Sequence, residues 1–274
     1  MVTGLLHPGI MGTAVGEAVD GEVLWASEGR SPATRSRALE AGFTEVPDLR
    51  TLCDRSTMIV SVCPPGAAEE VAQRVSATGY TGTYLDANAI APATARRIAT
   101  RFERFVDGGI VGLPPTPERR AALYLSGDDQ GVVGETAARF AHGSFEVHVV
   151  GGGTGAASAV KVCFAAWTKG TAALLTVINA LAAAEGVSEE LTAEWTLSMP
   201  DLPARSRATV AAIGPKAWRF GGELREIATA LSDAGLPGGF ASAAAETYDR
   251  LADLVDVPGP TLEDAVELLL GALR

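Results

Sequence analysis

The stretch of sequence that decides the fold is Val2-Thr3-Gly4-Leu5-Leu6-His7-Pro8-Gly9-Ile10-Met11-Gly12-Thr13. Residues 2–6 form an apolar run of strand length, and a helical pattern over residues 11–19 follows the turn. The turn has the form GxGxxG, with His7 in the place of the first glycine. In this form the second glycine lets a diphosphate approach the backbone, and the third lets the helix pack closely against the strand. We expect Gly9 and Gly12 to fill these two roles.

The start of the following helix strengthens this interpretation. Its first amide hydrogens have no partner inside the helix, and the positive end of the helix dipole favours a phosphate group. An ordinary glycine-rich turn is the alternative, but the position between the first strand and the first helix favours a binding site for a dinucleotide. His7 would either touch the diphosphate or cap the helix. The predicted contacts are His7, Pro8, Gly9, Ile10, Met11 and Gly12.

Short apolar runs alternate with helix-length segments through the first half of the chain. The runs cover residues 2–6, 22–25, 58–62, 83–86 and 105–111. The helical segments between them cover residues 11–19, 34–40, 67–76 and 92–101. Residues 123–126 and 146–150 are typical of two later strands, with a helix at 135–140 between them. This alternation predicts an α/β domain of the Rossmann type, a doubly wound parallel sheet covered by helices on both faces.

The pattern changes after Gly151-Gly152-Gly153, because strand-like runs disappear and alanine-rich helical patterns take over. We therefore predict a dinucleotide-binding domain over residues 1–152 and an all-helical substrate and dimerisation domain over residues 153–274. Residues 156–185 are expected to form one long helix, closed by Gly186 and followed by Ser188 as the next N-cap. A helix with apolar residues on all sides must bury most of its surface against other helices. We therefore predict a homodimer formed through the C-terminal helices.

Composition and charge exclude several classes of function. The chain has 274 residues, 47% of them hydrophobic, and a formal net charge of −11. Such a surface repels a phosphate backbone, so we expect no nucleic-acid partner. Three scattered cysteines and three histidines offer neither a disulfide framework nor the spacing of metal ligands, so no metal is expected.

The N-terminus begins directly with a strand, without the basic leader and apolar core of a secretory signal. The most apolar segment, residues 164–184, is interrupted by Lys169, Asn179 and several threonines. It is therefore more typical of a buried helix than of a membrane span. We expect a soluble cytoplasmic protein that does not enter a membrane.

The end of the second strand predicts which dinucleotide is bound. An acidic residue there would hold the ribose 2′-hydroxyl of NAD, whereas basic and hydroxyl groups would hold the 2′-phosphate of NADP. Ala26 occupies the usual acidic position, and Arg30 can pair with a phosphate unless it is only a solvated loop charge. We therefore predict NADPH, and NADH stays open because a small shift of register would make Glu28 the acid. The predicted contacts in this loop are Ser27, Arg30 and Ser31.

Four segments together resemble the β-hydroxyacid dehydrogenase superfamily, which also includes 6-phosphogluconate dehydrogenases and imine reductases. They are residues 4–12, 86–92, 106–112 and 155–161, in the order that the superfamily has. More narrowly, residues 157–163 and 167–175 resemble a branch of 6-phosphogluconate-dehydrogenase-like oxidoreductases with a distinct helical C-terminal domain. The resemblance implies an NAD(P)-dependent oxidoreductase with a catalytic lysine on the first helix after the dinucleotide-binding domain.

Lys161 occupies the position that matches this catalytic lysine. A hydride delivered to a carbonyl carbon places negative charge on the oxygen, which a nearby ammonium can stabilise and protonate. In the reverse direction a neutral lysine would accept the proton of the alcohol, so Lys161 is the predicted general acid and base. The alternative is that Lys161 only anchors the helix or pairs with an acid.

Further contacts are predicted from position in the chain. Cys63 and Pro64 follow the fourth strand and should lie along the cofactor, with Cys63 packing in the wall rather than acting as a nucleophile. Asn88 follows the fifth strand and should approach the nicotinamide ribose or the substrate. Ser158, Lys161 and Lys169 fall near one helix face. The candidate contacts of the small-molecule substrate are Gly112, Ser158 and Lys169.

Two departures from the superfamily pattern bear on the substrate. Val111 stands where the superfamily commonly has a serine that holds a carboxylate, and Ala165 stands where it has an asparagine one turn after the lysine. These changes favour a less polar ketone, aldehyde or imine over a hydroxy acid as substrate, although imine reductases generally lack the lysine.

A segment near residue 220 matches the superfamily loosely. It holds Trp218 and Phe220, for which we expect core packing. We rank a reductase or dehydrogenase acting on C=O first, an imine reductase second and a non-catalytic dinucleotide sensor third.

Overall fold

The computed structural model describes residues 1–271, and the chain divides into two compact units. The first unit is Met1–Val162, and the second begins at Cys163. The division lies inside a long helix, further along the chain than the triple glycine at which the sequence pattern changes. The first turns of that helix therefore belong to the first unit.

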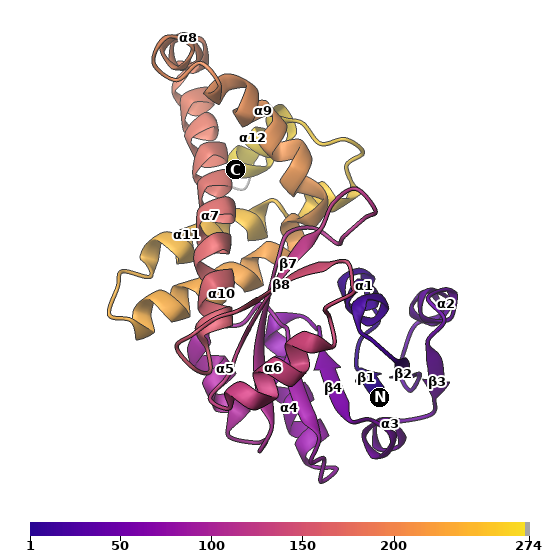
Figure 1. Ribbon diagram of the computed structural model, residues 1–274. Helices are drawn as coiled ribbons and strands as arrows, with labels where there is room; N and C mark the ends of the chain where they lie inside the picture. Colours follow the sequence, from indigo (N-terminus) through magenta and orange to yellow (C-terminus); the bar gives the residue numbers. More distant parts are fainter. Residues whose placement is uncertain (272–274) are drawn as a thin grey trace. The chain divides into compact units, whose positions relative to one another are not determined.

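Eight strands form one sheet within the described residues of the first unit, in the order β3-β2-β1-β4-β5-β6-β7-β8 (Figure 1). They are β1 (Val2–Leu5), β2 (Glu22–Ala26), β3 (Thr44–Val46), β4 (Met58–Ser61), β5 (Thr83–Asp86), β6 (Phe105–Val111), β7 (Ala121–Ser126) and β8 (Phe145–Val149). The strands from β1 to β6 are parallel, which confirms the predicted Rossmann-type sheet. β7 runs antiparallel to β6, and β8 is parallel to β7, an arrangement that the sequence did not predict.

The strand order reverses in the middle of the sheet. β1 pairs with β2 on one side and with β4 on the other, so Leu5 lies between Trp25 and Val60. The chain moves outward from β1 to β3 and then crosses back to β4. At the carboxyl ends of β1 and β4 the two connections therefore leave in opposite directions, and ligands of open α/β sheets bind at such a reversal.

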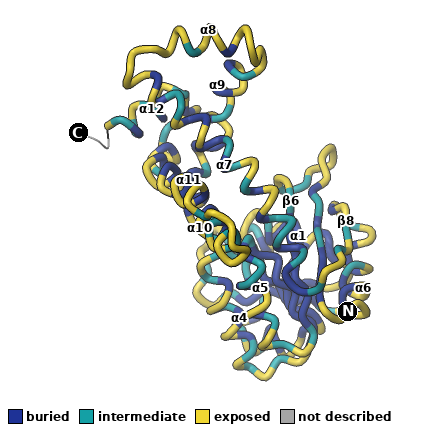
Figure 2. Tube along the Cα trace, turned by 90° about the vertical axis from the view of Figure 1, so that its left-hand side faces the viewer, coloured by how far each residue is buried: buried dark blue, intermediate teal, exposed yellow. Residues whose placement is uncertain are grey.

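Helices cover both faces of the sheet, as the sequence predicted. They are α1 (Ile10–Ala18), α2 (Pro32–Glu40), α3 (Leu49–Arg55), α4 (Ala68–Ser76), α5 (Pro92–Ala99) and α6 (Gln130–Ala138), with a short 3₁₀ turn η1 (Pro65–Ala67) before α4. One core contains Trp25 and residues of α1, α2 and α6, and the other contains Leu24 and residues of α3, α4 and α5. Figure 2 shows the strands as the most continuously buried part of this unit.

Two short elements of the first unit were missed by the sequence analysis, β3 and α3. β3 has three residues and α3 has seven, which is too short for a hydrophobic period to appear. The local feature that defines α3 is Asp48, whose side chain accepts a hydrogen bond of 2.8 Å from the amide of Thr51. A carboxylate at this position caps the free amides of the first helical turn.

The second unit is helical in the described residues, as predicted. Its elements are α7 (Ala156–Glu185), which starts in the first unit, α8 (Ser188–Ser198), α9 (Leu202–Ile213), α10 (Ala217–Asp233), α11 (Gly239–Arg250) and α12 (Leu262–Gly271), with 3₁₀ turns η2 (Gly214–Lys216) and η3 (Ala252–Asp256). α7 has the predicted bounds, and Gly186 closes it with a φ of 71°. Val187 rather than Ser188 stands at the N-cap of α8, which corrects the prediction. Among the described helices α7 is the one whose length and composition would suit a membrane span, a test that core helices also pass.

The start of α7 is fastened to β6 by a buried carboxylate, that of Asp107. Its Oδ2 accepts hydrogen bonds from the amides of Gly155 (3.1 Å) and Ser158 (2.9 Å), and its Oδ1 accepts one from Ser158 Oγ (2.5 Å). Ser126 Oγ also donates to Oδ2 and accepts from the amide of Ala157. Because the first amides of a helix have no partner within it, this carboxylate caps α7 and holds it against the sheet.

The close approach of α7 to β6 also depends on Gly109. A Cβ atom at this position would lie 2.4 Å from the carbonyl oxygen of Ala157 and 3.4 Å from Cβ of Lys161. The first contact is shorter than any tolerated by a real side chain, so glycine is required there. Asp107 and Gly109 together fix where Lys161 leaves the helix.

Replacing Asp107 by alanine should lower the free energy of unfolding by roughly 3–5 kcal/mol, because two amides and two hydroxyls lose their buried acceptor. Asp107→Asn should cost less, since one accepting oxygen remains. Asp129→Ala is the matched control, because Asp129 caps α6 at an exposed position and its loss should cost about 1 kcal/mol. Urea unfolding of the three variants measures the free energy of unfolding of each and so ranks the three losses. Equal losses for Asp107→Ala and Asp129→Ala would contradict the anchoring role.

Candidate active site

The turn between β1 and α1 has the shape that a diphosphate requires. Gly9 is the N-cap of α1, and no side chain of the described residues caps this helix start. A Cβ atom on Gly9 would meet nothing within 4 Å, so the backbone is open there, whereas one on Gly12 would lie 2.1 Å from the carbonyl oxygen of His7. The open position and the tight position are those predicted for the second and third glycines. The amides at residues 10–12 can therefore hold a phosphate group.

Two arginines brace this turn from the side of β2. Arg30 donates a hydrogen bond of 3.1 Å to the carbonyl of Leu6, and Arg37 on α2 donates one of 3.1 Å to the carbonyl of Pro8. Both bonds occupy carbonyl groups, so they leave the amide hydrogens of the turn for a ligand. The bond from Arg30 gives this side chain a structural role that the sequence did not predict.

His7 takes the place of the first glycine and is largely buried. Burial, followed by the charges of Arg30 and Arg74, lowers the pKa of His7 to about 4. The ring is therefore neutral at pH 7. Its Nδ1 is buried and has no hydrogen-bond partner among the described residues. A neutral imidazole with an unsatisfied ring nitrogen suits a wall of a binding pocket better than a cap of α1.

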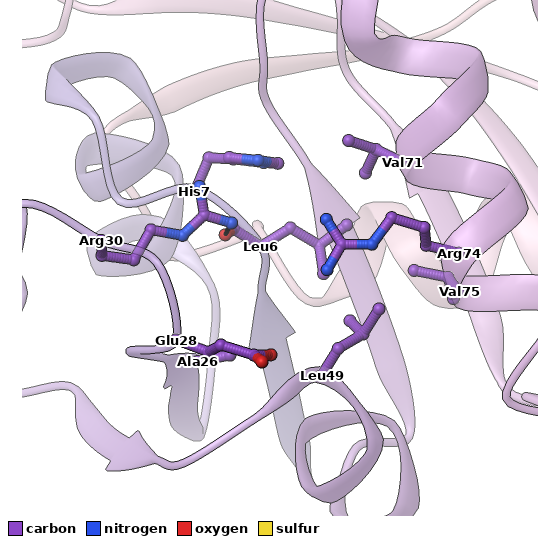
Figure 3. A pocket seen from close by; sticks show the side chains of 9 residues that line it. All are labelled: Leu6, His7, Ala26, Glu28, Arg30, Leu49, Val71, Arg74 and Val75. Carbon is purple, nitrogen blue, oxygen red and sulfur yellow. Dashed lines mark hydrogen bonds between the residues drawn. The ribbon is translucent and has the colours of Figure 1, made fainter.

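A pocket opens beside the turn, between the end of β2 and α4 (Figure 3). In Figure 3 the guanidinium groups of Arg30 and Arg74 point toward one another across it, and the carboxylate of Glu28 lies below them. The lining residues are Leu6, His7, Ala26, Glu28, Arg30, Leu49, Val71, Arg74 and Val75. Arg74 was missed by the sequence analysis, because nothing in its neighbourhood in the chain distinguishes it from a solvated charge of an amphipathic helix.

A second pocket lies on the other side of Arg30. It brings together the three residues predicted for a 2′-phosphate, Ser27, Arg30 and Ser31, and adds Arg35 and Glu45, which form an ion pair of 2.9 Å. Ser31 also caps α2, since its Oγ accepts a hydrogen bond of 3.2 Å from the amide of Thr34. Arg30 thus lines both pockets.

The loops after β4 and β5 are joined by Asn88. Its Oδ1 accepts a hydrogen bond of 2.5 Å from the amide of Cys63, and its Nδ2 donates one of 3.1 Å to Ser61 Oγ. Asn88 is only 2% exposed, so the structure places it as a brace between the two loops. Burial raises the pKa of the Cys63 thiol to about 11, so this cysteine is protonated at neutral pH. Pro64 follows at the start of η1.

Below this brace lies a carboxylate that the sequence analysis did not single out, that of Asp86. It is 1% exposed, and its Oδ1 accepts a hydrogen bond of 3.0 Å from the amide of Asn88. Its Oδ2 has no hydrogen-bond partner in the described part of the chain. Burial raises the pKa of Asp86 to about 7, and the charge of Asp107 acts in the same direction. Asp86 therefore exchanges a proton near neutral pH.

Lys161 lies on α7 at the carboxyl end of β6, within the first unit. Its Nζ donates a hydrogen bond to the carbonyl oxygen of Ile110, which is next to the last residue of this strand. Gly112 follows with a φ of 114°, a conformation that favours glycine. Ser158, one turn before Lys161, is fully buried against Asp107 and anchors the helix. Lys161 and the turn at Gly9 thus lie at the same edge of the parallel sheet.

Lys169 belongs to the second unit and is engaged there. It forms an ion pair with Glu223 on α10, lies 4.7 Å from the centre of the Phe220 ring, and accepts a hydrogen bond from Tyr248 on its carbonyl. Phe220 is buried, as expected. Trp218 is 61% exposed, so the expectation that it packs in the core was wrong.

Among the described residues no group of three or more histidine, cysteine, aspartate or glutamate side chains is arranged to hold a metal.

Comparisons of the sequence find two matches, both to proteins or domains without an assigned function. Residues 182–251 match a family described as a domain of unknown function, DUF1932. An uncharacterised 28.5 kDa protein from the 7S RNA 5′ region of Methanothermus fervidus is 28% identical over 172 residues. That match covers 62% of this chain and 65% of the length of the relative.

Solved structures of the same fold cover nearly the whole chain. Conserved protein MTH1747, of unknown function and described as structurally similar to 3-hydroxyacid dehydrogenases, has a TM-score of 0.68 at 25% identity, over 93% of this chain and 98% of that chain. A 3-hydroxyisobutyrate dehydrogenase from Mycobacterium tuberculosis, solved with L-serine, has a TM-score of 0.71 at 16% identity, over 98% of each chain. An imine reductase variant from Myxococcus stipitatus, solved with NAD⁺, has a TM-score of 0.57 at 18% identity, over 98% of this chain and 99% of that chain.

The resemblance inferred from the sequence is therefore confirmed in the fold. The sheet with its reversal at β1 and β4, the glycine turn and the helical second unit occur together in one chain. This protein has the fold of the 3-hydroxyacid dehydrogenases and imine reductases, and its helical unit carries a DUF1932 segment.

Proposed function

We propose that this protein is an NAD(P)H-dependent oxidoreductase that interconverts a small ketone, aldehyde or β-hydroxyacid-type substrate with its reduced or oxidised form. The observation that carries the proposal is the pairing of two features at one edge of the sheet. One is the open backbone at Gly9 with its uncapped helix start, and the other is Lys161, held by Asp107 and Ile110. Proteins of the same fold that are dehydrogenases and imine reductases support it.

The cofactor contacts come from the first unit. The amides that follow Gly9 hold the diphosphate, and the pocket of Ser27, Arg30 and Ser31 holds a 2′-phosphate, which favours NADPH. NADH remains the alternative, because Glu28 lines the neighbouring pocket. Structures of this fold include complexes with NADP⁺, NADPH and NAD⁺. When bound, the reduced nicotinamide supplies the hydride.

Lys161 supplies and removes the proton. Its hydrogen bond to the carbonyl of Ile110 fixes the direction of the ammonium group, which carries three donors. The ammonium stabilises negative charge that develops on a carbonyl oxygen and donates a proton to it. In the oxidative direction the neutral amine accepts the proton of the alcohol. Asp107 acts only through the placement of α7, because it lies buried below the helix start.

Alanine at the two glycines of the turn should separate cofactor binding from folding. Gly9→Ala should leave the melting temperature unchanged, because its Cβ enters open space, and should weaken NADPH binding at least tenfold by crowding the diphosphate. Gly12→Ala should lower the melting temperature, because its Cβ collides with the carbonyl of His7.

Calorimetry with NADPH and NADH, together with thermal unfolding, measures both effects. The wild type should bind NADPH more tightly than NADH. Tighter binding of NADH would contradict the cofactor preference, and no uptake of either nucleotide would contradict the proposed function.

Lys161→Ala should reduce turnover of a C=O substrate by about 10²- to 10⁴-fold, the usual contribution of a positioned acid or base, and should leave the dissociation constant of NADPH unchanged. The assay follows reduced nicotinamide absorbance with pooled ketones, aldehydes, hydroxy acids and cyclic imines. Lys216→Ala is the matched control, because this lysine lies on η2 of the second unit. Turnover of imines that survives Lys161→Ala would favour an imine reductase, and tight binding without any turnover would favour a sensor.

We also propose that the protein forms a homodimer through α7. Trp167, Leu174, Val177 and Leu181 are 41% to 65% exposed and recur about every one or two turns, so they share one side of the helix. A twofold axis can pair this face with its own copy. A second copy fits better than a lipid phase, because α7 also carries Lys161 and Lys169 and begins at a buried carboxylate. We likewise propose a soluble, cytoplasmic protein without a nucleic-acid or membrane partner, as the sequence led us to expect.

Leu174→Glu combined with Leu181→Glu should convert the dimer to a monomer, because each copy would bury two unpaired charges in the interface. Sedimentation velocity at micromolar concentration measures the change. Leu197→Glu is the control, since Leu197 is 81% exposed on α8 and outside this face, and it should remain dimeric. A monomeric wild type, or a dimer that tolerates the double change, would contradict the proposal.

A further inference from the structure

A row of polar side chains crosses four strands of the sheet. Ser61 on β4, Asp86 on β5, Asp107 on β6 and Ser126 on β7 are paired in register. Residues paired in register on neighbouring strands lie about 5 Å apart and point to the same face of the sheet. The carboxyl groups of Asp86 and Asp107 are therefore neighbours, and both are almost completely buried.

The two carboxyl groups differ in the hydrogen bonds that they accept. Asp107 accepts from two amides and two hydroxyls, and because amides can only donate, these bonds suit the ionised form. Asp86 Oδ1 accepts from the amide of Asn88, and its Oδ2 has no hydrogen-bond partner in the described part of the chain. Burial raises the pKa of both groups, but hydrogen bonds from Ser158 and Ser126 oppose the rise at Asp107. Since adjacent buried carboxylates repel each other, Asp107 keeps the charge and Asp86 keeps a proton.

Other titratable groups surround Asp86 from its own strand and from the elements packed on the same face. Tyr84 precedes it on β5 and Cys63 follows β4, and the charge of Asp86 opposes the ionisation of both. None of these groups donates a hydrogen bond to Asp86 Oδ2. The basic groups of the helices on this face have other neighbours: Arg74 acts on His7, Arg97 pairs with Glu69, Arg96 lies beside Gly155, and Lys161 is bonded to the carbonyl of Ile110.

Asn88 connects Asp86 to the loop after β4. Its amide donates to Asp86, and its side-chain oxygen accepts from the amide of Cys63. Loss of the proton would leave Asp86 Oδ2 charged, buried and unpaired beside Asp107. Asp107 is held by more donors, so the carboxylate of Asp86 is the one that would turn toward water. Asn88 would move with it, and the bond to Cys63 would weaken.

We propose that Asp86 is a positioning residue: while protonated it holds the loop after β5, and through Asn88 it aligns that loop with the loop after β4, whereas loss of its proton loosens both. Its effect on cofactor binding and turnover rests on the function proposed above, because Cys63 and Pro64 are predicted to lie along the cofactor. Asp86 itself touches neither cofactor nor substrate.

The first experiment is an NMR titration of the wild type without a ligand. The amide signals of Asn88 and Cys63 should shift together with a midpoint near pH 7, because the pKa of Asp86 is about 7 and both amides belong to the same chain of hydrogen bonds. Thr51 is the internal control. Its amide donates to Asp48, whose pKa is lowered by that bond, so its signal should not shift in this range.

The second experiment compares the wild type with Asp86→Asn, which keeps an accepting oxygen and removes the ionisation. The dissociation constant of NADPH for the wild type, divided by that for the variant, should be constant below about pH 6 and rise by up to about tenfold per pH unit above pH 7. The ratio at each pH cancels the titration of the nucleotide's own phosphates. For turnover, kcat/KM should fall by the same factor.

Asp129→Asn is the matched control for this comparison. Asp129 caps α6 at an exposed position, so the same chemical change there should leave the pH dependence of the wild type intact. An alkaline loss that persists in Asp86→Asn would belong to another group, such as Lys161, and would refute the positioning role.

The two experiments also separate this proposal from the proposed function. Asn88 and Cys63 signals that do not titrate together near pH 7 would refute the positioning role whether or not the protein binds a nucleotide. A common titration without uptake of either nucleotide would support the coupling of the two loops and refute the proposed function. Nucleotide binding with the same pH dependence in the wild type and Asp86→Asn would refute the positioning role and leave the proposed function standing.

Discussion

The buried carboxylate of Asp107 is the interaction on which the rest of the candidate site depends. It satisfies amides that the first turn of α7 cannot satisfy within the helix, and it does so from the middle of β6. The helix is therefore fixed in rotation as well as in position, and Lys161, one turn further along, leaves it toward the carboxyl end of the same strand. Removing a single charge would free a whole helix start, so the geometry of the proposed proton donor follows from a group that never touches the substrate.

The sequence predicted those parts of the fold that depend on neighbours in the chain. The strands of the central sheet are buried on both faces, as Leu24 and Trp25 in opposite cores illustrate, so they appear as short apolar runs. The glycine turn and the end of α7 at Gly186 are likewise local. β3 and α3 are too short for a period, and an apolar run carries no direction, so the reversal of β7 could not be predicted. Asp107 and Ser158 are 51 residues apart, and no local pattern joins them.

The same distinction explains which roles of polar residues near the site the sequence could not reveal. Ser158 and Asn88 are polar residues near the expected site, and no local pattern distinguishes a residue that contacts a ligand from one that joins two loops or anchors a helix. In the structure each satisfies buried neighbours, Ser158 at Asp107 and Asn88 at Cys63 and Ser61. A polar group whose hydrogen bonds are already made inside the protein has less capacity to bind a ligand. His7 Nδ1 and Arg30 Nε have no hydrogen-bond partner among the described residues, and both residues line the pocket beside the glycine turn.

His7 and Asp86 are buried titratable groups at the carboxyl edge of the sheet. They change the free energy of unfolding in opposite directions as the pH changes. His7 has a pKa of about 4 in the folded protein and an ordinary value of 6.5, so the unfolded chain binds more protons between these values and stability is lost as the pH falls through them. Asp86 has a pKa of about 7 against an ordinary 3.8, so the folded protein binds more protons in that window and stability is lost as the pH rises through it. The windows overlap, and the two slopes oppose each other between about pH 4 and 6.5. Over this interval the stability lost by protonating His7 in the unfolded chain is therefore offset in part by the stability gained as Asp86 takes up a proton in the folded protein.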